Sequence, residues 1–136
     1  MARASHALLA GAVVVAPNGQ ILLVWRSARD SLFPARWALP AGFLRSGEHP
    51  DSAMVREVAE ETGVRVKSGQ LIGFSTFRAG RSECLQLNYL VRQRTRARLS
   101  HHLTERVTWA DPSDALKRAD PFNQAIIRRA LEVMDG

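Results

Sequence analysis

The chain has 136 residues, of which 46% are hydrophobic and 24% are charged, and its net charge is +6. This length predicts one domain over residues 1–136 with no room for a second folded unit, because single domains are commonest at about 100 to 150 residues. The composition is typical of a soluble globular protein with a hydrophobic core, and it excludes the disordered and membrane-embedded classes.

The cysteine content and the N-terminal segment bear on the compartment. Cys84 is the single cysteine, which excludes an intramolecular disulfide and a cysteine-rich zinc site and indicates the reducing cytoplasm. The apolar run of residues 7–16 follows Arg3 and has the outline of a short secretory signal, but it serves better as a first buried strand. We therefore expect a cytoplasmic protein with no membrane partner.

Arginine supplies almost all of the positive charge, since Lys67 and Lys117 are the only lysines in the sequence. The planar guanidinium group suits bidentate contacts with phosphate, so the charge favours an anionic small molecule as substrate. It also allows weak attraction to nucleic acid, and net charge alone does not choose between the two. A homodimer is left open as well.

The N-terminal segment predicts a β-hairpin. Residues 12–16 and 21–25 are apolar, and they flank Pro17-Asn18-Gly19. Asn-Gly between two apolar runs is a strong signal for a strand, a tight turn and a second strand.

A helix is predicted after an irregular stretch. Residues 26–36 are polar, and a short strand over residues 37–39 leads into a loop that ends at Pro50. Proline is favoured at the first position of a helix, and Gly63 supplies a stop signal at the other end. The sequence therefore predicts a helix from Pro50 to Thr62.

The second half of the chain predicts strands followed by helices. Strand-like content marks residues 64–66, 71–77, 85–91 and 107–110, with a hairpin connection at residues 79–82. Apolar residues at helical spacing predict an amphipathic helix from Pro121 to Met134, and residues 111–118 favour a shorter one. This order of elements indicates an α/β or α+β fold, a mixed sheet covered by helices.

Three glutamates of the predicted Pro50 to Thr62 helix share one face, because Glu57, Glu60 and Glu61 stand at positions i, i+3 and i+4. Like charges so placed cost a helix roughly 0.2 to 0.5 kcal/mol per facing pair, so a positive group is expected beside them. A hard divalent cation such as Mg2+ fits oxygen ligands of this kind. Taken alone, however, the three glutamates fit a solvated acidic face better.

The surrounding sequence favours the metal site. Gly42 is followed after five residues by Glu48 and, after seven more, by Arg56-Glu57-Val58-Ala59-Glu60-Glu61-Thr62-Gly63-Val64. Residues 42–64 thus resemble the complete Nudix box, in which these identities and two aliphatic positions recur at fixed spacing. Ala41 stands where many members have a second glycine. The chain is identified as a member of the Nudix hydrolase superfamily.

This resemblance implies an α/β/α sandwich with a mixed central sheet, in which the box forms a loop, a helix and a loop. It also implies a Mg2+ site, with Mn2+ as a substitute ion. The implied ligands are the side chains of Glu57, Glu60 and Glu61 and the backbone carbonyl of Gly42. Arg56 would brace Glu57 through an ion pair, and Glu48 would be structural or a lesser contributor to the metal site.

The implied reaction is attack of water at phosphorus in a nucleoside diphosphate linked to another group. Glu57 and Glu60 are the candidates for the general base inside the box, and some members of the family recruit an acid from a later loop. Glu105 is the glutamate in that region of this chain, with His101 and His102 as weaker substitutes. Glu105 fits a surface glutamate equally well.

The C-terminal segment resembles the MutT-like nucleoside triphosphate pyrophosphohydrolases, because Trp109 is followed by Asp120-Pro121-Phe122-Asn123 and a final helix. In that resemblance Asn123 reads the base edge, where an amide can donate and accept at once, and Phe122 belongs to the same substrate-binding segment. Asparagine is also among the best N-cap residues, so that interpretation of Asn123 stays open. We expect a MutT-like (d)NTP pyrophosphohydrolase.

A competing pattern resembles part of the motif of coenzyme A diphosphatases. It runs from Leu22-Leu23-x-x-Arg26-Ser27 to Pro40-Ala41-Gly42, but Ser31 and Ala35 stand where that motif has Arg and Gly. With either substrate, Arg26 at a strand end is a candidate phosphate contact, and the alternative is a solvent-facing arginine. A coenzyme A or nucleotide-sugar diphosphatase is therefore one alternative function.

Two further alternatives concern nucleic acid and catalytic loss. Arg92, Arg94, Arg96 and Arg98 alternate, so a strand would place all four on one face. Such a face is most often solvated, but it could hold nucleic acid, as an RNA 5′ pyrophosphohydrolase would require. A catalytically silent nucleotide-binding Nudix domain could lose its metal ligands, whereas this chain retains all three glutamates.

Overall fold

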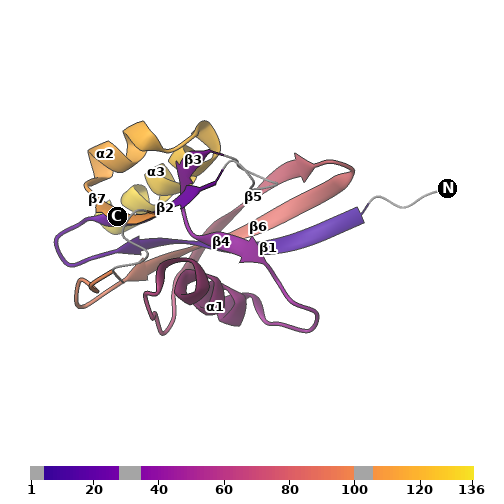
Figure 1. Cartoon of the computed structure of the whole chain (residues 1–136), viewed down its shortest axis with the longest axis horizontal. Coiled ribbons are helices and arrows are strands. Elements are labelled where there is room, and N and C mark those ends of the chain that lie inside the picture. Colours follow the sequence, from indigo (N-terminus) through magenta and orange to yellow (C-terminus); the bar gives the residue numbers. More distant parts are fainter. Residues whose placement is uncertain (1–4, 28–34, 100–105) are drawn as a thin grey trace.

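One mixed β-sheet with helices on both faces makes up the fold. The computed structural model describes residues 5–27, 35–99 and 106–136. Helix α1 (Pro50–Thr62) covers one face of the sheet, and α2 (Pro112–Arg118) and α3 (Pro121–Asp135) cover the other (Figure 1). This arrangement confirms the predicted mixed sheet between helical layers, an α+β sandwich.

The sheet has the strand order β3-β2-β1-β6-β5, with β4 paired to β1 and β7 paired to β2. Strands β1 and β6 are parallel, and the other pairs are antiparallel. The strands are β1 (Ser5–Val15), β2 (Ile21–Arg26), β3 (Arg36–Ala38), β4 (Ala41–Phe43), β5 (Gln70–Ala79), β6 (Ser82–Arg92) and β7 (Val107–Ala110).

The first hairpin forms as predicted. Val15 of β1 pairs with Ile21 of β2, and the amide of Gly19 donates to the Ala16 carbonyl across the turn. Gly19 has a φ of +88°, a conformation that glycine adopts without a steric penalty. Strand β1 begins earlier than predicted, so the apolar run of residues 7–16 supplies a strand whose parallel partner β6 extends just as far.

The ends of α1 agree with the predicted ones. The ring nitrogen Nδ1 of His49 accepts a hydrogen bond from the Asp51 amide at 3.1 Å, and Pro50 occupies the first turn. At the other end Gly63 has a φ of +76°, and its amide donates to the Ala59 carbonyl. The cap sets where the helix begins and the stop sets where it ends, so together they determine which residues face the sheet.

Two element predictions were wrong, and one conditional arrangement is not realised. Residues 64–66 form no strand; Val64 and Val66 instead bury their side chains in the core without joining the sheet. The stretch before the helix, predicted as a loop, contains β4, which pairs with β1 through Leu9 and Phe43. Strand β6 ends at Arg92, so the alternating arginines beyond it do not lie on a strand.

The two faces of the sheet bury separate apolar clusters. On the α1 face, Met54 and Val58 pack against the sheet together with Trp109, whose ring nitrogen Nε1 donates to the Ala97 carbonyl at 3.0 Å. On the opposite face, Ile126 and Ile127 of α3 pack among sheet residues. None of the helices in the described ranges is long and apolar enough to span a membrane.

Ile127 allows the α3 face to be tested. Its side chain is 0% exposed, so Ile127→Ala should leave a cavity and lower the free energy of unfolding by about 2 to 5 kcal/mol. The neighbouring exposed Arg128 is the matched control, because Arg128→Ala should change stability by no more than about 0.5 kcal/mol. Urea unfolding of both variants is the measurement. Equal, small losses would show that α3 does not pack as described.

Candidate active site

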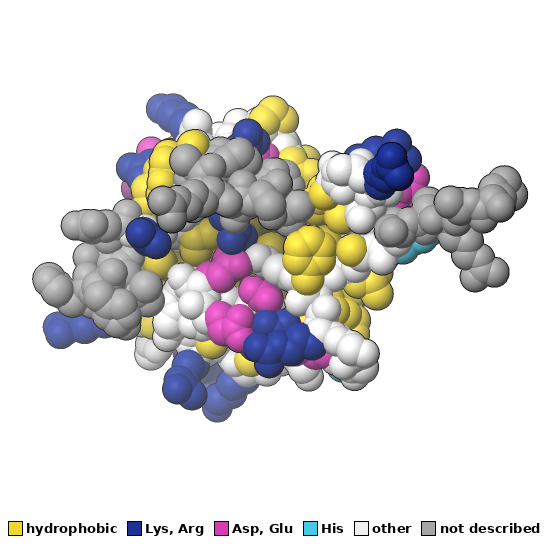
Figure 2. Space-filling view, turned by 45° about the vertical axis from the view of Figure 1, so that its right-hand side comes forward, with side chains coloured by type: hydrophobic (Ala, Val, Ile, Leu, Met, Phe, Trp, Pro, Cys, Tyr) yellow, Lys and Arg dark blue, Asp and Glu magenta, His cyan; other side chains and the backbone are white. Residues whose placement is uncertain are grey.

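The three glutamates of the Nudix box lie together on the side of α1 that borders β4. Acidic side chains gather near the middle of one face of the molecule, with basic side chains beside them (Figure 2). Glu57 and Glu61 are largely buried, with side chains 13% and 18% exposed, while that of Glu60 is 48% exposed. The helical spacing seen in the sequence is therefore realised as one acidic surface, partly withdrawn from solvent.

Arg56 links two of these glutamates to the loop before the helix. Its guanidinium donates to Glu57 Oε1 at 2.8 Å and to Glu60 Oε2 at 3.1 Å. It also forms a two-pronged pair with Glu48, with both N–O distances at 2.8 Å, and donates to the Phe43 carbonyl at 3.0 Å. Such a fork fixes geometry as well as charge, because its donors lie in one plane.

Glu48 is the anchor of this network in the loop. Its carboxylate accepts hydrogen bonds from the Arg56 guanidinium and from the backbone amide of Arg45, the latter at an N–O distance of 2.9 Å. The hydrogen bond from Arg56, followed by that from the Arg45 amide, lowers the pKa of the Glu48 carboxyl to about 2. Arg45 in turn pairs with Glu60 Oε1 at 3.1 Å. The box pattern leaves position 45 unspecified, so no sequence signal indicated this contact.

Glu61 belongs to a different pair. Its Oε1 accepts from Arg26 at 3.1 Å, and its Oε2 accepts from the Ala41 amide at 3.3 Å. Arg26 also donates to the carbonyls of Leu39 and Ala41. Burial raises the pKa of the Glu61 carboxyl to about 7, and the charge of Glu57 adds to the rise while Arg26 opposes it. Arg26 is therefore a largely buried partner of Glu61 and not the solvent-facing arginine considered as its alternative.

Gly42 lies directly against the Glu57 carboxylate. A Cβ atom at position 42 would overlap both carboxylate oxygens of Glu57 and the carbon between them. Any side chain here would displace the Glu57 carboxylate from the position in which Arg56 holds it. The fixed glycine of the box thus has a steric reason in this fold.

The chemistry of these groups fits a magnesium ion, although no ready-made cage is present. Within residues 5–27, 35–99 and 106–136, no three acidic, histidine or cysteine side chains converge as a group that could hold a metal. The glutamates instead face arginines, which supply the positive charge that the helix requires. The carboxylate oxygens of these glutamates are the kind of ligand that Mg2+ prefers, so the residues fit the ion.

The predicted substrate residues lie at the start of α3. Asn123 is 4% exposed; its Oδ1 accepts from the Leu39 amide at 3.3 Å, and its Nδ2 donates to Asp120 at 2.9 Å. Asp120 is the N-cap of α3, since its Oδ1 accepts from the Asn123 amide at 3.0 Å. The N-cap interpretation of Asn123 was therefore wrong. The sequence did contain a signal for Asp120 as the N-cap, because an aspartate directly before a proline is a usual helix start.

Two other predicted residues have different outcomes. Phe122 packs edge to face against Phe77 of β5, with ring centroids 5.3 Å apart. Glu105, together with its substitutes His101 and His102, lies outside the described residues. The structure thus brings together Glu57, Glu60, Glu61, Gly42, Arg56 and Arg26, while the Leu39 backbone connects this group to Asn123.

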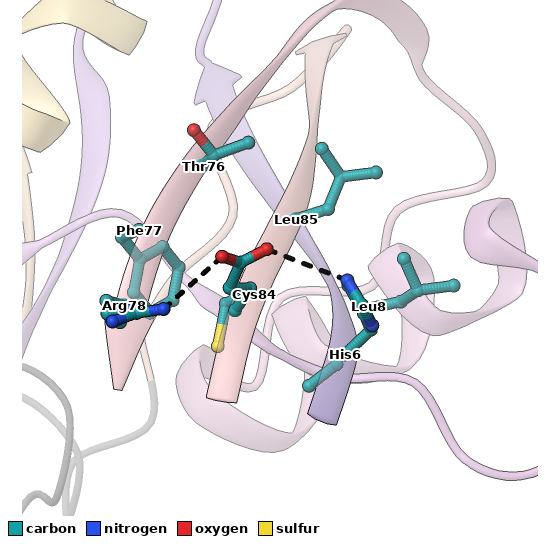
Figure 3. A pocket seen from close by; sticks show the side chains of 9 residues that line it. His6, Leu8, Thr76, Phe77, Arg78, Cys84 and Leu85 are labelled. Carbon is teal, nitrogen blue, oxygen red and sulfur yellow. Dashed lines mark hydrogen bonds and ion pairs between the residues drawn. The ribbon is translucent and has the colours of Figure 1, made fainter. Parts of the chain in front are cut away.

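Another concavity, of about 500 Å3, lies where the start of β1 meets the β5–β6 hairpin (Figure 3). The acidic side chain that lines it is Glu83, which pairs with Arg78 at 3.4 Å and with His6 at 3.6 Å. One carboxylate shared by two basic groups offers a hard cation no ligand set. The acidic surface on α1 is the better candidate for hydrolytic chemistry.

Solved structures with similar folds include MutT-type proteins. The MutT protein from Methanosarcina mazei Go1 superimposes with a TM-score of 0.83 at 18% identity over 100% of both chains. The NUDIX domain of Shewanella oneidensis NrtR, solved with ADP ribose, gives a TM-score of 0.71 at 21% identity, over 98% of this chain and 90% of that one. At these identities the likeness establishes the fold.

Sequence relatives establish the family. The family model of the NUDIX domain matches residues 5–130, so the chain belongs to the Nudix family. A MutT-like protein from Streptomyces ambofaciens is 26% identical over 96% of this chain and 79% of its own length. Mouse diphosphoinositol polyphosphate phosphohydrolase 3-alpha is 46% identical over 54 residues, 40% of this chain, and the match covers 30% of that protein. The predicted membership of the Nudix family is confirmed.

The pairing of Glu48 with Arg56 predicts a pH-dependent stability. Because the folded pKa of Glu48 is about 2, below the value of about 4.3 for a free glutamate, its contribution is complete above about pH 4.3 and is lost as pH falls toward 2. Glu48→Gln should therefore destabilise the protein near neutral pH, and this difference should shrink between about pH 4.5 and 2.5.

Urea unfolding at several pH values measures this difference. In a chain that already carries Arg56→Gln, Glu48→Gln should show a much weaker pH dependence, since the partner that lowers the pKa is absent. The same pH dependence in both backgrounds would contradict the role of Arg56.

Proposed function

We propose that the chain is a Mg2+-dependent MutT-like hydrolase that cleaves nucleoside triphosphates, (d)NTPs, by attack of water at phosphorus. The products would be a nucleoside monophosphate and inorganic pyrophosphate. One observation carries the proposal: Glu57, Glu60 and Glu61 share one surface, with Gly42 in contact with the Glu57 carboxylate. The MutT-like relative that matches 96% of this chain supports the substrate class.

In this proposal Glu57, Glu60, Glu61 and the Gly42 carbonyl would hold the ion. Mg2+, or Mn2+ in its place, supplies neutralisation of the diphosphate charge when bound there. Arg56 keeps the Glu57 and Glu60 carboxylates in fixed orientations, and the Ala41 amide with Arg26 does the same for Glu61. Arg26 is positioned to contact a phosphate only if it shares its guanidinium between Glu61 and the substrate.

The general base is proposed to be a glutamate. Glu57 and Glu60 both border the acidic surface, and Arg56 contacts each of them, so either would accept a proton from water in a set orientation. Glu105 remains the predicted candidate from the later loop. Substitution of each by glutamine keeps the shape of the side chain and removes the basic oxygen. Comparison of the three variants would therefore show which glutamate acts as the base.

A coenzyme A diphosphatase is the second candidate, favoured by one backbone conformation. Ala35 has a φ of +54°, in the left-handed region that favours glycine. It stands where the coenzyme A motif has glycine, the residue that adopts this conformation without strain. The substrate screen below includes coenzyme A for this reason.

A product-release screen with Mg2+ tests the reaction class. Nucleoside triphosphates, oxidised nucleotides, nucleotide sugars, dinucleotides and coenzyme A would each be incubated with the protein, and we expect turnover of a triphosphate. Glu57→Gln, Glu60→Gln and Glu61→Gln should each lower kcat by about 100-fold or more, the scale of lost acid-base or ligand chemistry. Glu132→Gln, on an exposed position of α3, is the control and should keep full activity.

The proposal fails under two outcomes of this screen. No turnover of any diphosphate compound with Mg2+ or Mn2+ would exclude the hydrolase. Full activity of the three box variants would place the chemistry elsewhere, whatever the substrate.

Base recognition by Asn123 has its own test. Its side-chain amide already forms hydrogen bonds with Leu39 and Asp120, so hydrogen bonding to a base would require the loss of one of these partners. If Asn123 reads the base, Asn123→Ala should change the order of kcat/KM among ATP, GTP, CTP and UTP and their deoxy forms. An unchanged order together with lower stability would identify Asn123 as a brace between α3 and Leu39.

A further inference from the structure

A cationic cavity lies where the segment after α1 meets the end of β6. Its volume is about 510 Å3, and it is lined by Arg65, Lys67, Ser68, Arg92, Gln93, Arg94 and Thr95. Both segments lie at the end of the sheet remote from the N terminus (Figure 1). No acidic side chain and none of the Nudix glutamates lines this cavity.

The four cations of the cavity differ from the arginines of the acidic surface. Arg26, Arg45 and Arg56 are each paired with glutamates. Among the residues that the structure describes, no ion pair is formed by the cavity's Arg65, Lys67, Arg92 or Arg94, and all four are exposed. Four like charges around one concavity repel one another, so an anion bound there would relieve the repulsion.

The positive charge continues along the chain beyond the cavity. Arg96 and Arg98 are exposed, and they alternate with Ala97 and Leu99, which pack against the core. The hydrogen bond from Trp109 to the Ala97 carbonyl fixes this segment to β7. Arg96 and Arg98 therefore follow the cavity residues Arg94 and Thr95 on an anchored segment, a continuation that suits an extended polyanion better than a compact one.

The sequence around the cavity is almost free of negative charge. Between residues 62 and 104 the single acidic residue is Glu83, and it pairs with Arg78 and His6 at the other end of the sheet. The same interval holds the four cations of the cavity as well as Arg96 and Arg98. The cations of the cavity are therefore not offset by acidic residues of the segments that line it.

We propose that this cationic cavity binds the phosphate backbone of a single-stranded nucleic acid, with the strand continuing along Arg96 and Arg98. Arginine and lysine contacts to phosphates give affinity without sequence preference. A duplex, which is a wide and stiff rod, would bridge the mouth of the cavity, whereas one strand can bend into it. The proposal goes beyond the proposed hydrolysis and does not depend on it.

Fluorescence anisotropy with a labelled oligonucleotide tests the proposal. The probe is a single strand of about 12 nucleotides, within the site sizes of single-strand binders, in DNA and RNA forms. It carries a 5′ hydroxyl, and divalent metal is left out, so the acidic surface cannot turn it over. Six backbone contacts, four in the cavity and two at Arg96 and Arg98, predict a slope of log K against log salt of about −4, and removal of two predicts about −3.

The cavity variant is Arg65→Glu with Arg92→Glu, and we expect its Kd for the probe to rise at least about tenfold at low salt. The matched control is Arg81→Glu with Arg128→Glu, which changes net charge equally at exposed positions outside the cavity. Its Kd should rise no more than about threefold, the effect of net charge alone. Circular dichroism and hydrolysis of the preferred substrate with Mg2+ show that each variant is folded.

Three outcomes would overturn the proposal. Equal losses in the cavity and control variants would assign the binding to net charge. Wild-type affinity in the cavity variant would place any nucleic-acid contact elsewhere. Displacement of the probe by tripolyphosphate at equal phosphate concentration would show a site for a compact anion instead of an extended strand. Failure of the hydrolase screen, in contrast, would leave the binding result unaffected.

Discussion

The guanidinium group of Arg56 holds the candidate site together. It reaches Glu48 and the Phe43 carbonyl in the segment before α1, and Glu57 and Glu60 on the helix itself. One planar group therefore ties the loop of the Nudix box to its helix, and it offsets the repulsion among glutamates that share one face. Loss of this group would leave Glu48 and Glu57 partly buried without their cation, which costs more than the loss of an exposed pair.

Arginine side chains occur in two different environments in this structure. Around the acidic surface, arginines are matched to glutamates and to backbone carbonyls, which orients the carboxylates for a hard cation. At the end of β6 the arginines face one another across a cavity without acidic residues. The arginines therefore have two different environments. On α1 they lie beside acidic residues, whereas no acidic residue lines the cavity at the end of β6.

The site depends on backbone positions as much as on side chains. Strand β4 brings Gly42 against Glu57, and Arg26 reaches from the end of β2 to the carbonyls of Leu39 and Ala41. The Leu39 amide then extends the connection to Asn123 at the start of α3. Helices on opposite faces of the sheet are therefore coupled through one short stretch of chain between β3 and β4.

The sequence by itself determined the helix of the box, the hairpin, the α3 helix and the family. Local signals suffice for these, because a cap, a stop and an i, i+3, i+4 spacing act within a few residues. Strand β4 was missed because three residues with a central glycine carry little strand preference, and β4 forms through its pairing with β1. Residues 64–66 looked like a strand because Val64 and Val66 are apolar, but they fill the core beside α1.

Only the tertiary structure decided which partners the site residues have. The pairing of Arg26 with Glu61 spans 35 residues, and that of Asn123 with Leu39 spans 84, so no local pattern could show them. Likewise, the cationic cavity arises because the segments after α1 and after β6 meet at one end of the sheet. Sequence spacing fixes what lies on one turn of a helix, whereas contacts between distant segments depend on how the whole chain packs.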